Sequence, residues 1–136
     1  MKIFICCSKA FYDRVPNIKS GLEAKGHKIT LPNSFDDPLR EEKMRRKGVG
    51  NHAKWKGEMI KEQGEKIRKN DAILVLNFKK NSQSNYIGGA TFLEMFKAYE
   101  LGKKIYLYNP IPDGMLRDEI LGFSPLVISG DLNKIN

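Results

Sequence analysis

Glu94 is the residue of this chain whose neighbours best suit covalent chemistry. It falls near the start of a predicted helix, on a side that it shares at helical spacing with Ala90, Thr91 and Ala98. Small neighbours leave room for a ligand, and the positive end of the helix dipole favours the ionised, nucleophilic form of a carboxylate. The alternative is a surface ion pair between Glu94 and Lys97, three residues later. Spacing alone leaves both interpretations open.

The segment after the first apolar run, Cys7 to Arg14, carries small, basic and aromatic side chains just before a predicted helix. Backbone N–H groups at such a helix start can hold an anion or a sugar hydroxyl, and an aromatic ring there can stack on a base. The segment lacks the glycines and the Gly-Lys-Ser/Thr ending of a Walker loop. The alternative is an ordinary helix entry with two partly buried rings. Its candidate ligand-binding residues are Cys7, Ser8, Phe11 and Tyr12, with Lys9 as a candidate phosphate contact.

Asp71 is a second candidate carboxyl, and it also has two interpretations. It opens the apolar run that ends at Asn77, so it either marks the polar start of a strand or brings a second carboxyl to the site. In parallel sheets ligands bind at the carboxyl ends of the strands, which favours the first interpretation. The two histidines and the adjacent pair of cysteines have no metal-ligand spacing. We therefore expect no metal and a reducing compartment.

The net charge of +8 is concentrated in one stretch of the chain. Residues 39–70 hold eleven Lys or Arg against five Glu, a local excess of +6. Such an excess attracts phosphorylated ligands or nucleic acid, although a solvated helix face next to a mobile loop has the same composition. Nucleic acid is the weaker interpretation, because Trp55 is the only aromatic residue there. We expect Arg45, Arg46 and Lys47 to belong to a mobile lid that binds a 5′-phosphate.

Five apolar runs alternate with helical patterns along the chain, which predicts a parallel sheet covered by helices on both faces. We expect one doubly wound, flavodoxin-like α/β domain over residues 1–136, with strand order 2-1-3-4-5 and a long basic loop at about 34–51. The predicted strands are Lys2 to Cys7, His27 to Leu31, Asp71 to Asn77, Lys104 to Tyr108 and Pro125 to Ser129. The predicted helices are Asp13 to Lys25, His52 to Asn70, Gly88 to Gly102 and Asp113 to Leu121.

In such a sheet the ligand lies outside the carboxyl ends of the strands, at the switch between the first and third strands. The ligand is therefore expected near residues 7–12, 77–89 and 109–113. The candidate substrate-binding residues in the later segments are Gly88, Gly89 and Asn109, in addition to Thr91. In the helix that carries Glu94, the apolar stripe of Phe92, Met95, Phe96 and Tyr99 predicts the face that packs on the core.

Composition restricts the class of protein further. With 40% hydrophobic and 29% charged residues the chain is typical of a folded protein, and no apolar run reaches the roughly 18 residues of a membrane helix. The first residues carry one charge and too short an apolar stretch for a secretory signal. We therefore expect the protein in the cytoplasm.

The stretch Asn70-Asp-Ala-Ile-Leu-Val-Leu, a polar loop, and then Gly89-Ala-Thr-Phe-Leu-Glu-Met-Phe-Lys-Ala-Tyr-Glu-Leu-Gly-Lys-Lys-Ile-Tyr-Leu resembles the nucleoside 2-deoxyribosyltransferase family. That superfamily also contains the 2′-deoxynucleoside 5′-monophosphate N-glycosidases. By this resemblance Glu94 would attack the anomeric carbon and form a covalent deoxyribosyl-enzyme, and Asp71 would handle the base. Thr91 would lie near the sugar, and Phe11 or Tyr12 would line the base pocket.

The resemblance also implies that the chain acts without metal or organic cofactor on a small nucleoside or nucleotide. It implies a homo-oligomer, a dimer or dimer of dimers, with Trp55, Met59 and Phe96 as candidate apolar contacts. The basic insertion favours a phosphorylated substrate. Ala90 and Phe96 replace glycines of the family signature, and Gly88 replaces an acidic residue. These departures keep open a second hypothesis, a non-catalytic nucleotide-binding or sensing module of the same fold.

Overall fold

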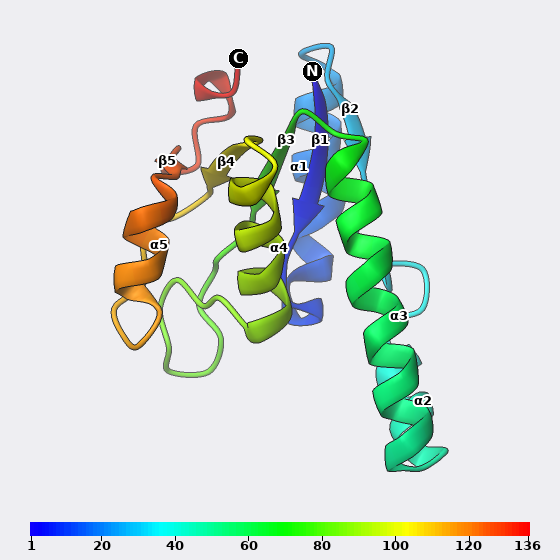
Figure 1. Ribbon diagram of the computed structural model, residues 1–136. Coiled ribbons are helices and arrows are strands. Elements are labelled where there is room, and N and C mark those ends of the chain that lie inside the picture. The colour runs from blue at the N-terminus through cyan, green and yellow to red at the C-terminus, as the bar shows by residue number, and fades with distance from the viewer.

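The computed structural model describes residues 1–136 and contains one parallel sheet with the strand order β2-β1-β3-β4-β5 (Figure 1). This is the flavodoxin-like arrangement, so the predicted fold class and strand order are confirmed. The strands are β1 (Lys2–Cys6), β2 (Lys28–Thr30), β3 (Ala72–Val75), β4 (Lys104–Leu107) and β5 (Leu126–Val127).

Helices cover both faces of this sheet (Figure 1). The first half of the chain contains the 3-10 helix η1 (Lys9–Arg14), α1 (Val15–Glu23), α2 (Arg40–Arg46) and α3 (Val49–Arg68). The second half contains α4 (Gly89–Glu100), α5 (Arg117–Phe123) and the 3-10 helix η2 (Leu132–Lys134). The helix predicted from Asp13 is thus divided into η1 and α1, and α5 begins later than predicted.

β1 and β3 are two of the three inner strands of the sheet, and their side chains are apolar on both faces, as a buried position requires. They pair in parallel with Phe4 opposite Ile73, and every residue of β3 is buried. Two hydrophobic clusters result. Leu22 of α1 packs in one of them, while Ile67 of α3, Met95 of α4 and Ile120 of α5 pack in the other. The sheet therefore separates α1 from α3, α4 and α5.

The predicted basic loop at about 34–51 is mostly helical, which corrects the expectation from sequence. Residues 40–46 form α2, and α3 begins at Val49. Carboxylates in the first turn and cations in the last turn stabilise α2 through the helix dipole, and Glu41 pairs with Arg45 one turn later. Gly48 makes the turn between the helices with φ of 107°, a conformation that favours glycine. The α2–α3 hairpin projects beyond the rest of the fold (Figure 1).

The face that α4 turns to the core also differs from the prediction. Phe96 and Tyr99 are 47% and 54% exposed, whereas Thr91, Glu94, Met95 and Ala98 are buried. The aromatic residues Phe92, Phe96 and Tyr99 instead surround Phe123 of α5, with ring centroids 5.6, 6.5 and 5.5 Å from it. The aromatic stripe therefore lies over the groove between two helices, and the small-residue side that carries Glu94 faces inward.

Candidate functional site

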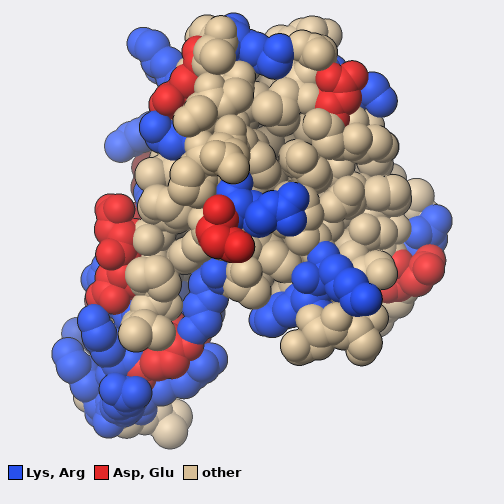
Figure 2. Space-filling view, turned by 180° about the vertical axis from the view of Figure 1, so that it is seen from behind, with Lys and Arg blue, Asp and Glu red and all other residues tan.

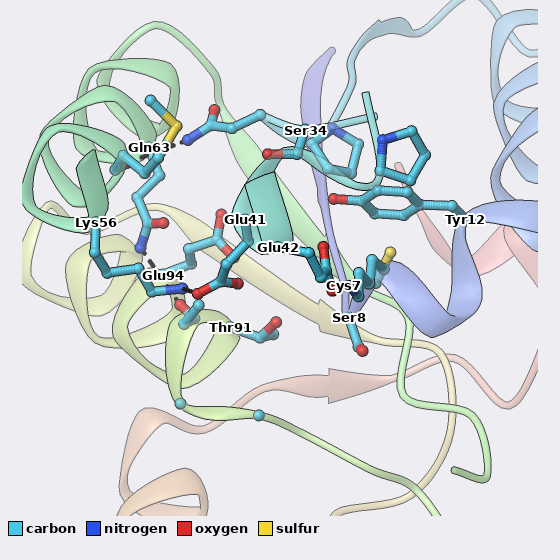
Figure 3. A pocket seen from close by; sticks show the side chains of 18 of the residues that line it. Cys7, Ser8, Tyr12, Ser34, Glu41, Glu42, Lys56, Gln63, Thr91 and Glu94 are labelled. Carbon is cyan, nitrogen blue, oxygen red and sulfur yellow. Dashed lines mark hydrogen bonds and ion pairs between the residues drawn. The ribbon is translucent and has the colours of Figure 1, made fainter. Parts of the chain in front are cut away.

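A polar cavity of about 600 Å³ lies where the carboxyl ends of β1, β2 and β3 meet the α2–α3 hairpin (Figure 3). Its walls come from the segment after β1, the loop after β2, both hairpin helices, the loop after β3 and the start of α4. This is the edge of the sheet at which the strand order reverses, where ligands bind in folds of this kind. Figure 2, which is seen from behind relative to Figure 1, shows the hollow between the α2–α3 hairpin and the rest of the fold.

Glu94 is the buried carboxyl of this cavity. It is 8% exposed and lines the cavity together with Thr91, one turn earlier on α4 (Figure 3). The surface-pair alternative is wrong, because Lys97 Nζ donates to Glu100 Oε1 at 2.9 Å. Glu94 thus has no ion partner in direct contact.

Burial raises the pKa of Glu94 to about 8, although the Cys6 thiol and the more distant ammonium groups of Lys66 and Lys56 act to lower it. Loss of hydration disfavours the charged form of a carboxyl more strongly here than the helix dipole favours it. The expectation that the position near the start of α4 keeps Glu94 ionised is therefore wrong for the unliganded protein. At neutral pH the protonated form predominates.

The segment after β1 contributes Cys7, Ser8, Lys9 and Tyr12 to the cavity, as expected. Ser8 Oγ accepts a hydrogen bond from the backbone N–H of Ala10 at 3.3 Å and so begins η1. Burial raises the pKa of Cys7 to about 12 and also raises the pKa of Tyr12. Both side chains are neutral at physiological pH, and they offer the ligand a thiol and a phenol.

Phe11 lies outside the cavity, whereas Tyr12 lines it. Of the two aromatic residues expected to line a base pocket, only Tyr12 is therefore placed to contact a ligand in this cavity. The Phe11 ring is buried and meets the Phe78 and Tyr86 rings edge-on, with centroid distances of 5.5 and 6.4 Å. Tyr12 packs against Phe35 of the loop after β2 at 5.5 Å. Figure 3 shows its hydroxyl on the same side of the cavity as Ser34.

The start of α4 forms another wall, to which Gly88, Gly89 and Thr91 contribute as predicted. No side chain caps this helix, which leaves backbone N–H groups of its first turn free. A Cβ at Gly88 would lie 3.1 Å from the Tyr86 hydroxyl, so glycine permits the close approach of that ring. The Lys80 ammonium lies 4.7 Å from the centre of the same ring.

Two carboxylates of α2 reach the cavity, and the sequence analysis missed them. Glu41 Oε2 lies 2.9 Å from His52 Nε2, 3.2 Å from Lys56 Nζ and 3.3 Å from Arg45 Nη2. Partial burial opposes ionisation of Glu41, but these partners lower its pKa below the ordinary value. Glu42 pairs with Lys9. Lys9, Arg45 and Lys56 of this wall are thus each paired with a carboxylate, and Arg45 and Lys56 share Glu41. The signal in the sequence was the spacing of four residues between Glu41 and Arg45, which is typical of an ion pair on a helix.

Three polar atoms among the cavity residues are buried and have no hydrogen-bond partner: Asn33 Oδ1, Glu42 Oε2 and Trp55 Nε1. The Asn33 amide nitrogen is engaged, since it donates to the Met59 carbonyl at 3.1 Å. Trp55 is buried and its ring stacks on His52, with 6.0 Å between centroids. Trp55 and Met59 therefore belong to the cavity wall, not to the outer surface that the sequence analysis assigned them.

Several predicted site residues lie elsewhere. Asp71 is exposed at the amino end of β3, opposite the cavity, and its carboxylate accepts a hydrogen bond from the Lys2 backbone N–H at 2.8 Å. That bond holds the pKa of Asp71 below its usual range. Asp71 is thus the polar start of the strand and is not placed to handle a base.

Asn109 is held by Asn77, outside the cavity lining. The Asn109 backbone N–H donates to Asn77 Oδ1 at 2.8 Å, and the Asn109 side chain donates to the Asn77 carbonyl at 3.1 Å. Of the predicted lid cations only Arg45 lines the cavity. Arg46 and Lys47 are exposed near the tip of the hairpin, over which basic side chains gather (Figure 2).

No cluster of three His, Cys, Asp or Glu side chains has the geometry of a metal site. No helix of this protein has both the length and the apolar character needed to span a bilayer. Comparison with models of known protein families and with curated proteins gave no match to the chain. The flavodoxin-like fold and the contents of the cavity therefore carry the functional argument.

Proposed function

We propose that this chain binds a 2′-deoxynucleoside 5′-monophosphate and cleaves or transfers its N-glycosidic bond through Glu94. The observation that carries the proposal is a buried carboxyl without an ion partner, facing a polar cavity at the carboxyl edge of the sheet. The resemblance of residues 70–107 to the nucleoside 2-deoxyribosyltransferase family supports the same reaction.

In this reaction the ionised Glu94 carboxylate attacks the anomeric carbon of the deoxyribose. The C1′–N bond breaks, and its electron pair leaves with the base, which takes up a proton. The resulting glycosyl-Glu94 ester is then attacked at the same carbon by water or by a second base, which releases the carboxylate. The small side chain of Thr91 leaves space for the sugar beside Glu94.

The free N–H groups at the start of α4 support a phosphate position there, with Lys80 as the nearby cation. Lys80 has no carboxylate within 4 Å, whereas Lys9, Arg45 and Lys56 are each paired with Glu41 or Glu42. We therefore propose that Lys80 is the main cation for the phosphate. Of the three cations predicted in the lid, only Arg45 lines the cavity and is placed to assist, whereas Arg46 and Lys47 are not. Arg45 is therefore the one lid cation that remains a candidate phosphate contact.

A second candidate function is a non-catalytic nucleotide-binding or sensing module. The specific observation that favours it is the pKa of about 8 for Glu94, because a protonated carboxyl binds through hydrogen bonds but is a weak nucleophile. Both functions predict nucleotide binding. Only the first predicts release of free base.

The deciding experiment incubates the wild type and the Glu94→Gln variant with the common deoxynucleoside 5′-monophosphates at pH 8.5 and follows free base by chromatography. Glu94→Gln keeps the size of the side chain but removes the attacking charge, so we expect release to fall by about three orders of magnitude or more. Glu100→Gln, an exposed carboxyl on the same helix, is the matched control. Undiminished release by Glu94→Gln would eliminate the nucleophile, and binding without release by the wild type would establish the sensing function.

We also propose that two copies of the chain associate through the exposed aromatic face of α4 and α5. One contiguous cluster is formed by Phe92, Phe96, Tyr99 and Phe123, of which Phe96 and Tyr99 are exposed. Exposed apolar residues of an ordinary surface are scattered singly, so a contiguous aromatic cluster indicates a contact surface. An exposed apolar patch of this kind suits a two-fold symmetric dimer, in which the same patch of each copy contacts the other. This replaces the contact that the sequence assigned to Trp55 and Met59.

A further inference from the structure

We propose that this protein has a second ligand site, at the amino ends of β4 and β5, for a small molecule that joins two or more phosphate groups to an apolar or aromatic part. The site is an open cavity of about 400 Å³ at the edge of the sheet opposite the Glu94 cavity. The two cavities share no lining residue. The second site therefore does not depend on the function that we propose for Glu94.

The cavity lies where β5 does not cover the edge of β4. β5 pairs with β4 only at Tyr106 and Leu107, so the first residues of β4, Lys104 and Ile105, have no strand beside them on that edge. Successive N–H groups of a strand point to opposite sides in the plane of the sheet. The Lys104 N–H donates toward β3, to the Asp71 carbonyl at 3.3 Å, so the Ile105 N–H faces the uncovered edge. Ile105 lines the cavity, which therefore has a backbone donor in its wall.

Three lysines line this cavity, Lys103, Lys104 and Lys134, and none of them has a carboxylate partner. The ion pairs that the protein makes within 4 Å all involve other cations. Lys103 Nζ donates instead to the Arg68 carbonyl at 3.2 Å, which holds its ammonium group at the end of α3. Like charges around one cavity repel one another, and an anion bound among them replaces this repulsion with attraction. The charge of this cavity therefore favours an anionic ligand.

The donors of this cavity suit phosphate groups. A lysine ammonium is a compact charge with rotatable N–H donors, and the oxygens of a phosphate accept such bonds from several directions. Backbone N–H groups at the edge of a sheet likewise contribute to anion sites. Because three lysines and the Ile105 N–H surround one cavity, we infer that its ligand carries more than one phosphate group.

The cavity also has apolar side chains that a ligand can reach. Leu126, the first residue of β5, is 51% exposed, and Phe123 at the end of α5 is half-buried. Both residues line the cavity. An apolar chain or aromatic ring that packs against them gains free energy from the surface it buries, and the cavity has the volume of a small-molecule site. These side chains favour a phosphorylated organic molecule over an inorganic anion of the same charge.

The test follows the backbone N–H signals of the isotope-labelled protein by NMR while inorganic pyrophosphate, ADP or adenosine is added. The signals of Ile105, Ser124 and Leu126 report on this site, and those of Gly89 and Thr91 report on the Glu94 cavity, so each titration measures both sites separately. We expect pyrophosphate and ADP to shift the first set of signals to saturation. ADP should bind there several-fold more tightly than pyrophosphate, because its adenosine part buries apolar surface, and adenosine alone should not bind there.

Two double variants of equal net charge assign the contacts. Lys104→Gln with Lys134→Gln removes two exposed cations of the site but keeps long polar side chains, and it should weaken pyrophosphate at the first set of signals by roughly tenfold or more. Lys54→Gln with Lys61→Gln is the control, because both lysines are exposed on α3 and line neither cavity. It should leave the affinity of this site unchanged. Leu126→Thr should remove the advantage of ADP over pyrophosphate and leave pyrophosphate binding as it is.

Absence of a saturable shift at Ile105, Ser124 and Leu126 with both phosphate compounds would overturn the second site. Equal losses of affinity in the two double variants would also overturn it, because net charge alone would then attract the anion. Adenosine that binds at these signals as tightly as ADP would show that the lysines take no phosphate. Shifts confined to Gly89 and Thr91 would overturn the second site and leave the function proposed for the Glu94 cavity standing.

Discussion

Gln63 of α3 donates its side-chain amide to the carbonyl of Ala90 at 3.3 Å and so ties α3 to the first turn of the helix that carries Glu94. Both residues line the cavity, and Gln63 is buried. This bond fixes one wall of the cavity against another, although the two residues are 27 positions apart in the chain.

Gln63→Ala should therefore lower the free energy of unfolding, because it removes the amide that joins α3 to α4 and the packing of a buried side chain. We expect a loss of about 1 to 2 kcal/mol, measured by urea denaturation. Gln83→Ala, at an exposed position in the loop after β3, is the control and should change stability by less than about 0.5 kcal/mol. Equal effects of both changes would show that the bond between α3 and α4 contributes nothing.

The stability of the protein should fall as the pH rises, through the titration of Glu94. Its pKa in the folded state is about 8, against an ordinary value of 4.5, so between these values the folded state retains a proton that the unfolded chain has lost. Stability from this group is thus complete below about pH 4.5 and lost as the pH rises through 8.

Glu94→Gln has no titrating group at this position and should remove that dependence. Relative to wild type, the variant should gain stability between pH 5 and 9, by roughly 5 kcal/mol when the shift is fully expressed. Thermal or urea unfolding of both proteins across this range measures the difference. Parallel pH profiles for the two proteins would mean that Glu94 ionises normally in the folded state.

Base release should rise with pH if Glu94 is the nucleophile. Only the ionised carboxylate attacks, so kcat/KM should increase roughly tenfold per pH unit below about 8 and level off above it. Initial rates on one deoxynucleoside 5′-monophosphate between pH 6 and 9.5 give the profile. A rate that declines over this range would assign the active form to protonated Glu94, whereas a flat rate would mean that ionisation of Glu94 does not control the reaction between pH 6 and 9.5.

Asp71→Asn should leave base release unchanged, since Asp71 lies at the edge of the sheet opposite the cavity. Its lowered pKa makes a small contribution to stability that is present above its ordinary value of 3.8 and lost as the pH falls below it. The melting temperatures of wild type and Asp71→Asn should therefore differ slightly at pH 7, and the difference should shrink as the pH falls below 3.8. A large loss of activity in Asp71→Asn would show that Asp71 takes part in the reaction after all.

Phe96→Ser should shift the protein from dimer to monomer, because Phe96 is the central ring of the exposed face of α4. Light scattering or sedimentation at several concentrations measures the state. Val49→Ser, at an exposed apolar residue of the hairpin, serves as the control for general surface polarity. A wild type that stays monomeric at high concentration rejects the proposed dimer.

The order of the strands and the position of Glu94 on a helix could be predicted from sequence because both depend on local patterns. The apolar runs at residues 3–5 and 73–75 predict buried parallel strands, and the alternation with helical segments leaves few topologies for them. Small residues at helical spacing around Glu94 likewise indicate an open side, whatever the rest of the chain does.

What only the tertiary structure decided is which surface of each element is covered by another. Phe96 and Tyr99 have the spacing of a core face, but α5 covers that side only in part. Residues 40–46 have no buried side chain to reveal a helix by its periodicity, and Glu41 and Glu42 reach the cavity only because Gly48 folds α2 back along α3. Asp71 and Glu94 lie at opposite edges of the sheet because one opens a strand and the other follows its carboxyl end. Chemistry that depends on contacts between distant segments was therefore decided by packing, whereas the fold that makes those contacts was already determined by the sequence pattern.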